Sequence, residues 1–375
     1  MEYLPSEVLV KILSRLPVTS LMQCKLVCRA WYRLTKDPYL ASVRFSCVGE
    51  NDPSLILESV NPNQNEFYSV DLSALDEGNL EVNKICLPTL PRFYVEGSCK
   101  GLLCLCDSTT KYQLYIYNLF TGRTSSCPMS TEFPIHETLF RLGFGFHPIT
   151  KEYKVLKITY HSTHRPILYS GDQICGMESQ VQIFTLGSLA WRSLGEIPYL
   201  LSETSPQVLV SGRLHWHAWP DSSIISFDLA DEQFRVVPKP GCGGLDRCTF
   251  SLVALGGCLC AAVSHNYCPS EIWVMRDYDV KESWTMDFRV GFHVPKGLKQ
   301  KLPEPLKASN FKFYYQLTHK VISVLCLMKN GNILLDYNGR ALVSYDPIRG
   351  TFKDLLFYQR SFWLHAVVHV GNLSH

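Results

Sequence analysis

The sequence lacks a clear excess of either charge. Its 375 residues include 36 Lys and Arg against 34 Asp and Glu, so we expect no broad attraction to nucleic acid or to an anionic membrane. A short basic cluster of Lys296, Lys299 and Lys301 is interpreted as a solvated loop rather than a binding patch. Any binding specificity must therefore lie in local surfaces of a globular protein, since 46% of the residues are apolar.

Long apolar segments are absent as well. Glu2 and Glu7 interrupt the region where a signal peptide would need a continuous apolar stretch, so no export is expected. The longest apolar run, Leu252 to Val263, is too short to span a bilayer and contains Gly256-Gly257. It predicts two buried strands joined by a turn. The fifteen cysteines then indicate a reducing compartment, the cytoplasm or the nucleus.

No complete catalytic or metal-binding motif is present. Gly143–Phe146 and Gly241–Gly244 lack the spacing of phosphate loops, so we interpret both as turns in a β domain. Cys104–Cys106, Cys258–Cys260 and His215–His217 place alternate residues on one face of a strand, without the paired spacing of a zinc site. These triplets are interpreted as buried packing. We expect no cofactor, no metal and no catalytic residue.

The first forty residues show the spacing of short helices. One helix is predicted to begin at Pro5, which suits a first helical position, and to end at Pro17. Its apolar face comprises Leu9, Ile12, Leu13 and Leu16. A second helix carries Val27, Ala30, Trp31 and Leu34, and a short helical turn is predicted around Leu21–Gln23. Periodicity alone does not decide between a structural cap and a partner-binding module.

The residues themselves favour a partner-binding module. Leu4–Leu9, Ile12–Pro17, Ser20-Leu21 and Val27–Leu34 together resemble the F-box. The resemblance implies docking on a Skp-type adaptor and, through it, on the cullin and RING subunits of a ubiquitin ligase. It places eight residues at or beside the adaptor: Leu4, Pro5, Ile12, Leu13, Leu16, Val27, Cys28 and Trp31. Some of them are expected to form the core of the module, and Leu4, Pro5 and Ile12 are the preferred anchors.

Beyond about Asn51–Pro53 the apolar period changes to that of strands. A unit recurs in which a glycine turn and an apolar strand precede an aromatic-rich strand, as in Gly101–Leu105 followed by Tyr115–Arg123. Its interval of about forty-five residues or more is typical of propeller blades, of which six or seven are expected. Pairing Leu55–Ser59 with the final strand Trp363–Val370 would close the array and hide its edges.

A second resemblance covers this β region. Gly97–Leu103, Leu142–Phe146, Tyr153–Val155 and Ala190–Arg192 resemble the F-box-associated domain of plant F-box proteins. The two resemblances imply a mainly β chain, with a three-helix F-box over residues 1–48 and a kelch-like β-propeller over residues 54–370. In that family the propeller recognises a protein target.

The expected function is therefore a non-enzymatic receptor that presents a bound protein for ubiquitination and degradation. Two alternatives stay open, a glycan-binding F-box receptor and a propeller enzyme with a structural helical cap. Substrate contacts are expected on loops. The candidate segments are Thr159–Glu178, Lys239–Arg247 and Phe292–Asn310. Tyr160, Tyr169, Trp219 and Tyr267 are candidate exposed aromatics, although ordinary strand packing is the favoured interpretation of all four.

Overall fold

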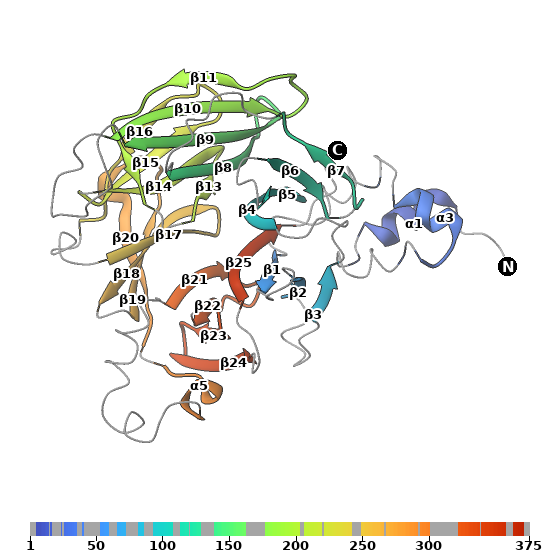
Figure 1. Cartoon of the computed structure of the whole chain (residues 1–375). Coiled ribbons are helices and arrows are strands. Elements are labelled where there is room, and N and C mark those ends of the chain that lie inside the picture. Colours follow the sequence, from blue (N-terminus) through green and yellow to red (C-terminus); the bar gives the residue numbers. More distant parts are fainter. Residues whose placement is uncertain are drawn as a thin grey trace. The chain divides into compact units, whose positions relative to one another are not determined.

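The computed structural model shows a chain built mainly of β-strands (Figure 1), which confirms the predicted fold class. It describes residues 5–14, 16, 24, 26–35, 40, 53–59, 66–72, 82–85, 93–107, 113–119, 121–128, 139–162, 177–202, 206–219, 221–241, 249–265, 268–291, 293–300, 322–337, 339–357 and 363–370. Within these ranges, no helix has both the length and the apolar character needed to cross a membrane.

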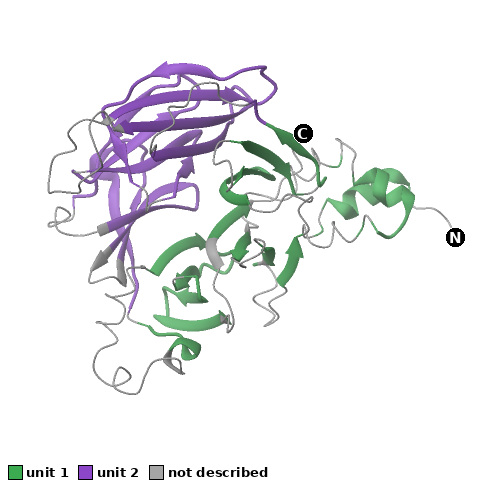
Figure 2. Cartoon of the chain, viewed as in Figure 1, with its two compact units in different colours: residues 1–126, 293–375 green, residues 127–292 purple. Residues whose placement is uncertain are grey.

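The chain divides into two compact units (Figure 2). Unit 1 consists of residues 1–126 and 293–375, and unit 2 consists of residues 127–292. Each unit contains three antiparallel sheets in its described residues, and the total of six agrees with the predicted six or seven blades. Five sheets have four strands, while the sixth has a fifth, short strand paired with the second strand of its order.

The sheets of unit 1 have the strand orders β25-β1-β2-β3, β4-β5-β6-β7 and β21-β22-β23-β24. Their strands are β1 (Pro53–Ser59), β2 (Glu66–Asp71), β3 (Val82–Ile85), β4 (Phe93–Cys99), β5 (Leu102–Asp107), β6 (Leu114–Asn118), β7 (Thr124–Ser126), β21 (Ile322–Leu327), β22 (Ile333–Tyr337), β23 (Ala341–Asp346), β24 (Thr351–Phe357) and β25 (Trp363–Val370). The helices α1 (Ser6–Leu13), α3 (Arg29–Leu34) and α5 (Lys296–Gln300) also belong to this unit.

The sheets of unit 2 have the orders β11-β10-β9-β8, β12-β14-β15-β16 with β13 also on β14, and β17-β18-β19-β20. Their strands are β8 (Leu139–His147), β9 (Glu152–Ser162), β10 (Met177–Thr185), β11 (Arg192–Gly195), β12 (Leu200–Leu201), β13 (Val208–Val210), β14 (Arg213–Trp219), β15 (Ser223–Asp228), β16 (Phe234–Val237), β17 (Thr249–Leu255), β18 (Cys258–His265), β19 (Cys268–Met275) and β20 (Trp284–Arg289). A 3₁₀ turn, η3 (Lys281–Ser283), precedes β20. The predicted strand pair within Leu252–Val263 is confirmed by β17 and β18.

The first and last strands of the β region pair with each other, as predicted. β1 lies antiparallel to β25, with Leu55 opposite Val368 and Leu57 opposite Ala366. The sheet is thus assembled from the two ends of the β region, so that the backbone groups of β1 are paired on both sides.

The middle strands of the sheets are buried on both faces. On β1, Leu55 and Leu57 pack in one apolar cluster with β21 and β22, whereas Ile56 packs in another with β4 and β5. Successive side chains of a strand point to opposite faces, so neighbouring sheets cover both faces of this one. The alternating pattern expected from sequence therefore holds for first strands such as β4, while middle strands such as β5 are continuously apolar.

The Gly143–Phe146 motif lies inside β8 and not in a turn, so the predicted turn is wrong. A Cβ atom on Gly143 would lie 2.8 Å from side-chain atoms of Leu214 and Trp216, and one on Gly145 would lie 2.8 Å from Leu229. The glycines are thus required by the close packing of β8 against the next sheet. Residues 242–244 of the second glycine motif lie outside the described residues.

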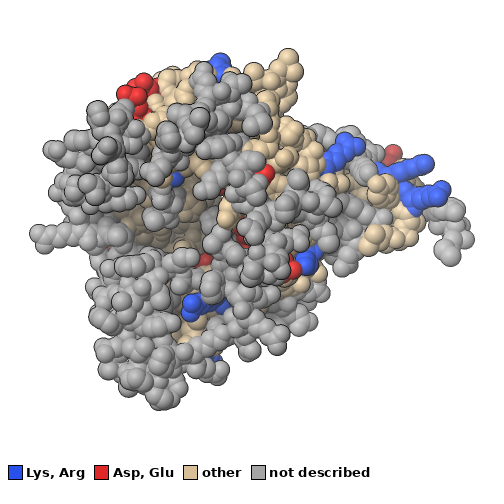
Figure 3. Space-filling model, in the orientation of Figure 1, with Lys and Arg blue, Asp and Glu red and all other residues tan. Residues whose placement is uncertain are grey.

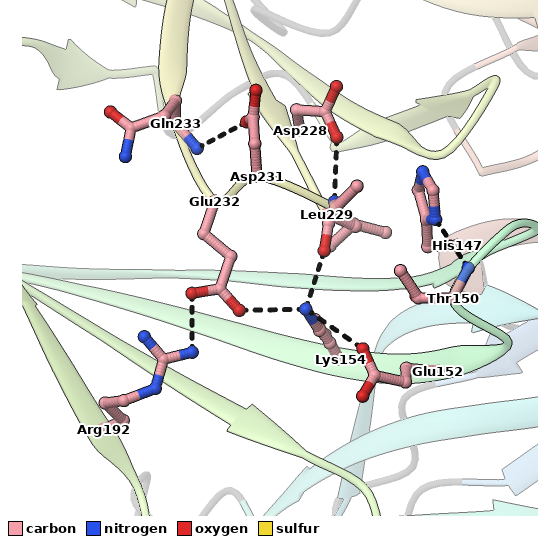
Figure 4. Close-up of polar contacts among 11 residues, drawn as sticks. His147, Thr150, Glu152, Lys154, Arg192, Asp228, Leu229, Asp231, Glu232 and Gln233 are labelled. Carbon is pink, nitrogen blue, oxygen red and sulfur yellow. Dashed lines mark hydrogen bonds and ion pairs between the residues drawn. The ribbon is translucent and has the colours of Figure 1, made fainter.

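A buried ion-pair network also joins two sheets of unit 2 (Figure 4). The Lys154 ammonium, on a side chain only 5% exposed, donates to the backbone oxygen of Leu229 at 2.8 Å and to Glu232 at 2.9 Å. Glu152 lies 3.3 Å from the same ammonium, and Arg192 pairs with the other oxygen of Glu232 at 2.6 Å. A charge so deeply buried requires such partners, so we interpret the network as structural.

The predicted domain limits, residues 1–48 and 54–370, remain a prediction. Between Leu40 and Pro53 the chain lies outside the described residues, as does the predicted helical turn at Leu21–Gln23.

Candidate functional site

Helix α1 presents an exposed apolar face beside a buried one. Val10 and Leu13 are buried in a small core with Cys24 and Leu40. Val10 and Leu13 are three residues apart and share the buried face of the helix. Ile12 is 43% exposed and does not belong to that face. Of the predicted apolar face, Leu13 is therefore buried, Leu9 and Leu16 are half-buried, and Ile12 is exposed. A helix exposing apolar side chains above its own core has the pattern of a docking surface.

The ends of α1 also differ from the prediction. Pro5 precedes the helix as its N-cap, and its carbonyl accepts hydrogen bonds from the N–H groups of Val8 and Leu9. The helix ends at Leu13, about one turn before Pro17. Ser14 closes it there, since its hydroxyl donates to the carbonyl of Lys11 at 3.0 Å.

Helix α3 has no fully buried residue. Trp31 and Leu34 are half-buried against the small core, whereas Tyr32 is exposed. Val27 is 62% exposed and lies in the turn before the helix, not within the helix as the spacing predicted. A short helix with no buried residue is not expected to be stable alone. A partner that covered it would bury its apolar side chains.

Of the eight residues that the F-box resemblance assigned to the adaptor, the seven described ones fall into three groups. Pro5, Ile12, Val27 and Cys28 are exposed and free of the small core. Leu16 and Trp31 are half-buried against it, and Leu13 is fully buried within it. Leu4 lies outside the described residues. The first group is the one available to a partner, while Leu13 supports the module from inside.

Sequence reasoning missed three exposed apolar residues of this region: Val8, Leu26 and Tyr32. Val8 precedes Ile12 by four positions, so the two share one face of α1. That spacing was visible in the sequence. Leu26 and Tyr32 carry no such signal, because their exposure depends on where the chain turns before α3.

The described charged residues of this module are mainly basic. Lys11, Arg29 and Arg33 are all exposed, against the single described acid Glu7. Figure 3 shows Lys and Arg side chains gathered over the N-terminal helices. We use the name F-box face for these exposed apolar residues, Val8, Ile12, Leu26, Val27 and Tyr32, together with the three cations. It suits a partner surface that is apolar and acidic.

The histidine and cysteine triplets of the β region serve packing where the structure describes them. His215 is buried, its Nδ1 donates to the carbonyl of Val208 at 3.1 Å, and its Nε2 accepts from the Tyr278 hydroxyl at 2.7 Å. Burial lowers its pKa to about 4. Cys104, Cys106 and Cys260 are buried, as predicted, and Cys258 is half-buried. The described residues form no group of three or more potential metal ligands.

The four aromatic candidates for substrate contact separate clearly. Tyr160 is buried, its hydroxyl donates to the carbonyl of Tyr199 and accepts from the N–H of Leu201, so it is a packing residue. Trp219 is 53% exposed at the end of β14. Tyr169 and Tyr267 lie outside the described residues. Only Trp219 therefore remains as a described exposed aromatic among the four.

Comparison with known proteins finds a family match for each of the two regions. Residues 1–43 match the F-box-like family, and residues 46–301 match the F-box associated beta propeller domain. An F-box protein of Arabidopsis thaliana is 44% identical over 399 residues, which cover 100% of this chain and 92% of that protein. The F-box protein CPR1 of the same plant is 26% identical, over 80% of this chain and 75% of its own.

A small helical module with exposed apolar side chains precedes six sheets in the described residues. The helical part matches the F-box-like family, and the β part matches the F-box associated propeller family. The chain belongs to the F-box proteins that carry an F-box associated β-propeller domain.

Proposed function

We propose that the chain is the substrate-recognition subunit of a Skp-cullin-F-box ubiquitin ligase. The F-box face carries this proposal, because its apolar side chains are exposed on and beside the described N-terminal helices. Covering Ile12 and Val27 would remove large apolar side chains from water, at about 25 cal/mol for each Å² buried.

The receptor needs no catalytic group of its own. By binding a target with its propeller and the adaptor with its F-box, it raises the effective concentration of a target lysine near the charged conjugating enzyme. Ubiquitin transfer is then performed by the other subunits, with degradation of the target as the consequence. The family membership supports this non-enzymatic role.

The basic residues of the F-box face support an acidic adaptor surface. Lys11, Arg29 and Arg33 are exposed, so they would act mainly by steering the encounter and fixing the orientation, and less by raising affinity. The apolar residues between them would supply most of the binding free energy.

Cysteines packed as apolar side chains support a location in the cytoplasm or the nucleus. Seven of the nine cysteines whose side chains are described are buried. Burial raises the pKa of Cys127, Cys260 and Cys326 to about 12, so these thiols resist ionisation and behave as small apolar side chains. When the chain unfolds, these thiols become accessible and could form disulfides, and a reducing compartment prevents this.

The test is binding of the full chain to a purified Skp adaptor. We predict that the double substitution Ile12→Ala/Val27→Ala weakens binding by about thirtyfold or more, as for the loss of one interface anchor of about 2 kcal/mol. Because both side chains are exposed, the variant should unfold at the same temperature as the wild type. Titration calorimetry measures the affinity.

The matched control is Leu189→Ala, which removes an even more exposed apolar side chain, from the β10–β11 turn. It should bind the adaptor like the wild type. If the folded wild-type chain fails to bind any Skp adaptor, or if the double variant binds unchanged, the proposal is wrong.

A further inference from the structure

Trp219 stands at the end of β14 on a surface that no packing requirement explains. Its side chain is 53% exposed, and it pairs across the sheet with Leu200 of β12, which is half-buried. Alternation along β14 puts His217 on the same face of the sheet as Trp219. An exposed indole with an apolar neighbour is the composition of an interface anchor.

The backbone beneath Trp219 is held by several side-chain hydrogen bonds. The Tyr160 hydroxyl bonds both Tyr199 and Leu201 at 3.1 Å, and Arg141 Nε donates to the carbonyl of Leu201 at 3.1 Å. The N–H of Ser202 donates to the carbonyl of His217 at 2.7 Å. These bonds fix the β12–β14 pair before any partner arrives, so binding here would cost little ordering entropy.

Two polar groups lie beside the indole. The His217 ring meets the Phe250 ring edge to face at 4.8 Å, and among the described residues nothing hydrogen-bonds to its nitrogens. Burial, and then the charge of Lys239, lower the pKa of His217, so its ring is neutral at pH 7 and offers one donor and one acceptor.

Lys239 supplies the charge of this surface. Among the described residues its ammonium donates one hydrogen bond, to the backbone oxygen of Asp221 at 2.9 Å, and an ammonium has three donors. The Asp221 carboxylate accepts from the Ser223 hydroxyl at 2.6 Å, and this bond, together with the nearby charge of Lys239, lowers its pKa. The site thus combines the exposed Trp219 indole with the Lys239 ammonium, which hydrogen-bonds to a backbone carbonyl oxygen.

Two of the segments predicted to contact substrate start at the same end of these sheets. The predicted segment Thr159–Glu178 begins in β9, whose Tyr160 hydroxyl accepts from Leu201 of β12, and the predicted segment Lys239–Arg247 begins at Lys239 itself. The surface formed by Leu200, His217, Trp219 and Lys239, which we call the Trp219 surface, therefore adjoins the first residues of two segments predicted to contact substrate.

We propose that the Trp219 surface binds an extended segment of the target protein, with an aromatic or proline side chain on the Trp219 indole and a neighbouring carboxylate on Lys239. Flat apolar side chains stack on indole with little loss of entropy. A carboxylate accepts from the Lys239 ammonium and balances its charge. This inference rests on the proposed receptor function and names the chemistry of its target.

The test selects peptides on the immobilised full chain from a phage-displayed library of random short sequences. We expect enrichment of an aromatic or proline residue next to Asp or Glu. Trp219→Ala should then weaken binding of an enriched synthetic peptide by about tenfold or more in fluorescence polarisation. Lys239→Glu should change the selected charge from acidic to basic. Leu189→Ala should leave binding unchanged.

Two results would overturn the inference: no enrichment of the aromatic-acid or proline-acid pair, or equal binding of enriched peptides by wild type and Trp219→Ala. Adaptor binding, measured on the same preparations, separates the two proposals. A chain that binds the Skp adaptor but shows either result remains a receptor with its target site elsewhere. A chain that binds the selected peptide but not the adaptor contradicts the ligase proposal alone.

Discussion

At the scale of single residues, Glu232 is the side chain on which the buried network depends most. It is 14% exposed and bridges Lys154 to Arg192. We predict that Glu232→Gln lowers the free energy of unfolding by on the order of 2 kcal/mol, between the cost of breaking an exposed pair and a fully buried one. The reason is that Lys154 keeps its charge inside the protein with one anionic partner fewer. Urea denaturation measures the change.

The neighbouring residue provides a matched control for this prediction. Asp231 pairs with Arg235, and both side chains are about half exposed. Asp231→Asn should leave the urea midpoint unchanged, because water screens that pair. If the two substitutions changed the urea midpoint equally, burial would not be the reason why the Lys154 network stabilises the fold.

Residue types indicated chemistry more reliably than they indicated burial. Tyr160 and Trp219 both looked like candidate contact residues, yet Tyr160 is buried and Trp219 is exposed. The difference is one of packing, since Tyr160 follows Leu156 and Ile158 on the face of β9 that enters a core cluster, whereas Trp219 lies at the end of β14 outside that cluster. In the same way, the spacing on α1 predicted a helix but not which apolar side chains would face its core.

At the scale of elements, β8 packs so closely on the next sheet that it has no room for a side chain at Gly143. We predict that Gly143→Ala lowers the free energy of unfolding by about 1 to 3 kcal/mol, as expected for overpacking. The added methyl would lie 2.8 Å from the rigid indole of Trp216 and from Leu214, so the sheets must separate or shift. Thermal or urea unfolding, followed by tryptophan fluorescence, measures the loss.

Gly241 offers the control for a glycine in open space. A Cβ there would meet no atom within 4 Å, and its backbone does not require a positive φ. Gly241→Ala should therefore be neutral or slightly stabilising, because alanine restricts the unfolded chain. A similar loss of stability in both variants would mean that packing against Trp216 is not the cause.

At the scale of the whole molecule, the sequence predicted which strands exist and how the array closes. The pairing of β1 with β25 followed from the need to hide two sheet edges, and Leu55 and Leu57 do lie opposite β25. The two-sided burial of strands such as β5 could not be read from alternation, because it depends on neighbouring sheets. The position of a side chain in a long connection depends on tertiary contacts. Substrate-binding residues could therefore not be assigned from local sequence patterns.

Two buried histidines, one in each unit, make the stability of the β region sensitive to mild acid. Burial lowers the pKa of His215 in unit 2 and of His369 in unit 1 to about 4, from an ordinary value of 6.5. Both rings are neutral when folded, while the unfolded chain takes up a proton at each as pH falls below 6.5. Stability is therefore expected to decline between pH 6.5 and 4, by up to about 3 kcal/mol for each histidine.

Urea denaturation at pH 7.5, 6.0 and 5.0, values that avoid most carboxylate titration, measures this decline. His215→Gln should lower stability at pH 7.5, because it disturbs the bonds to Val208 and Tyr278, but should also flatten the pH dependence of unit 2. The slope separates the two effects, since lost packing shifts the whole curve and only a lost titration changes its steepness. A curve equally steep in the variant and the wild type would show that His215 is not a source of the acid sensitivity.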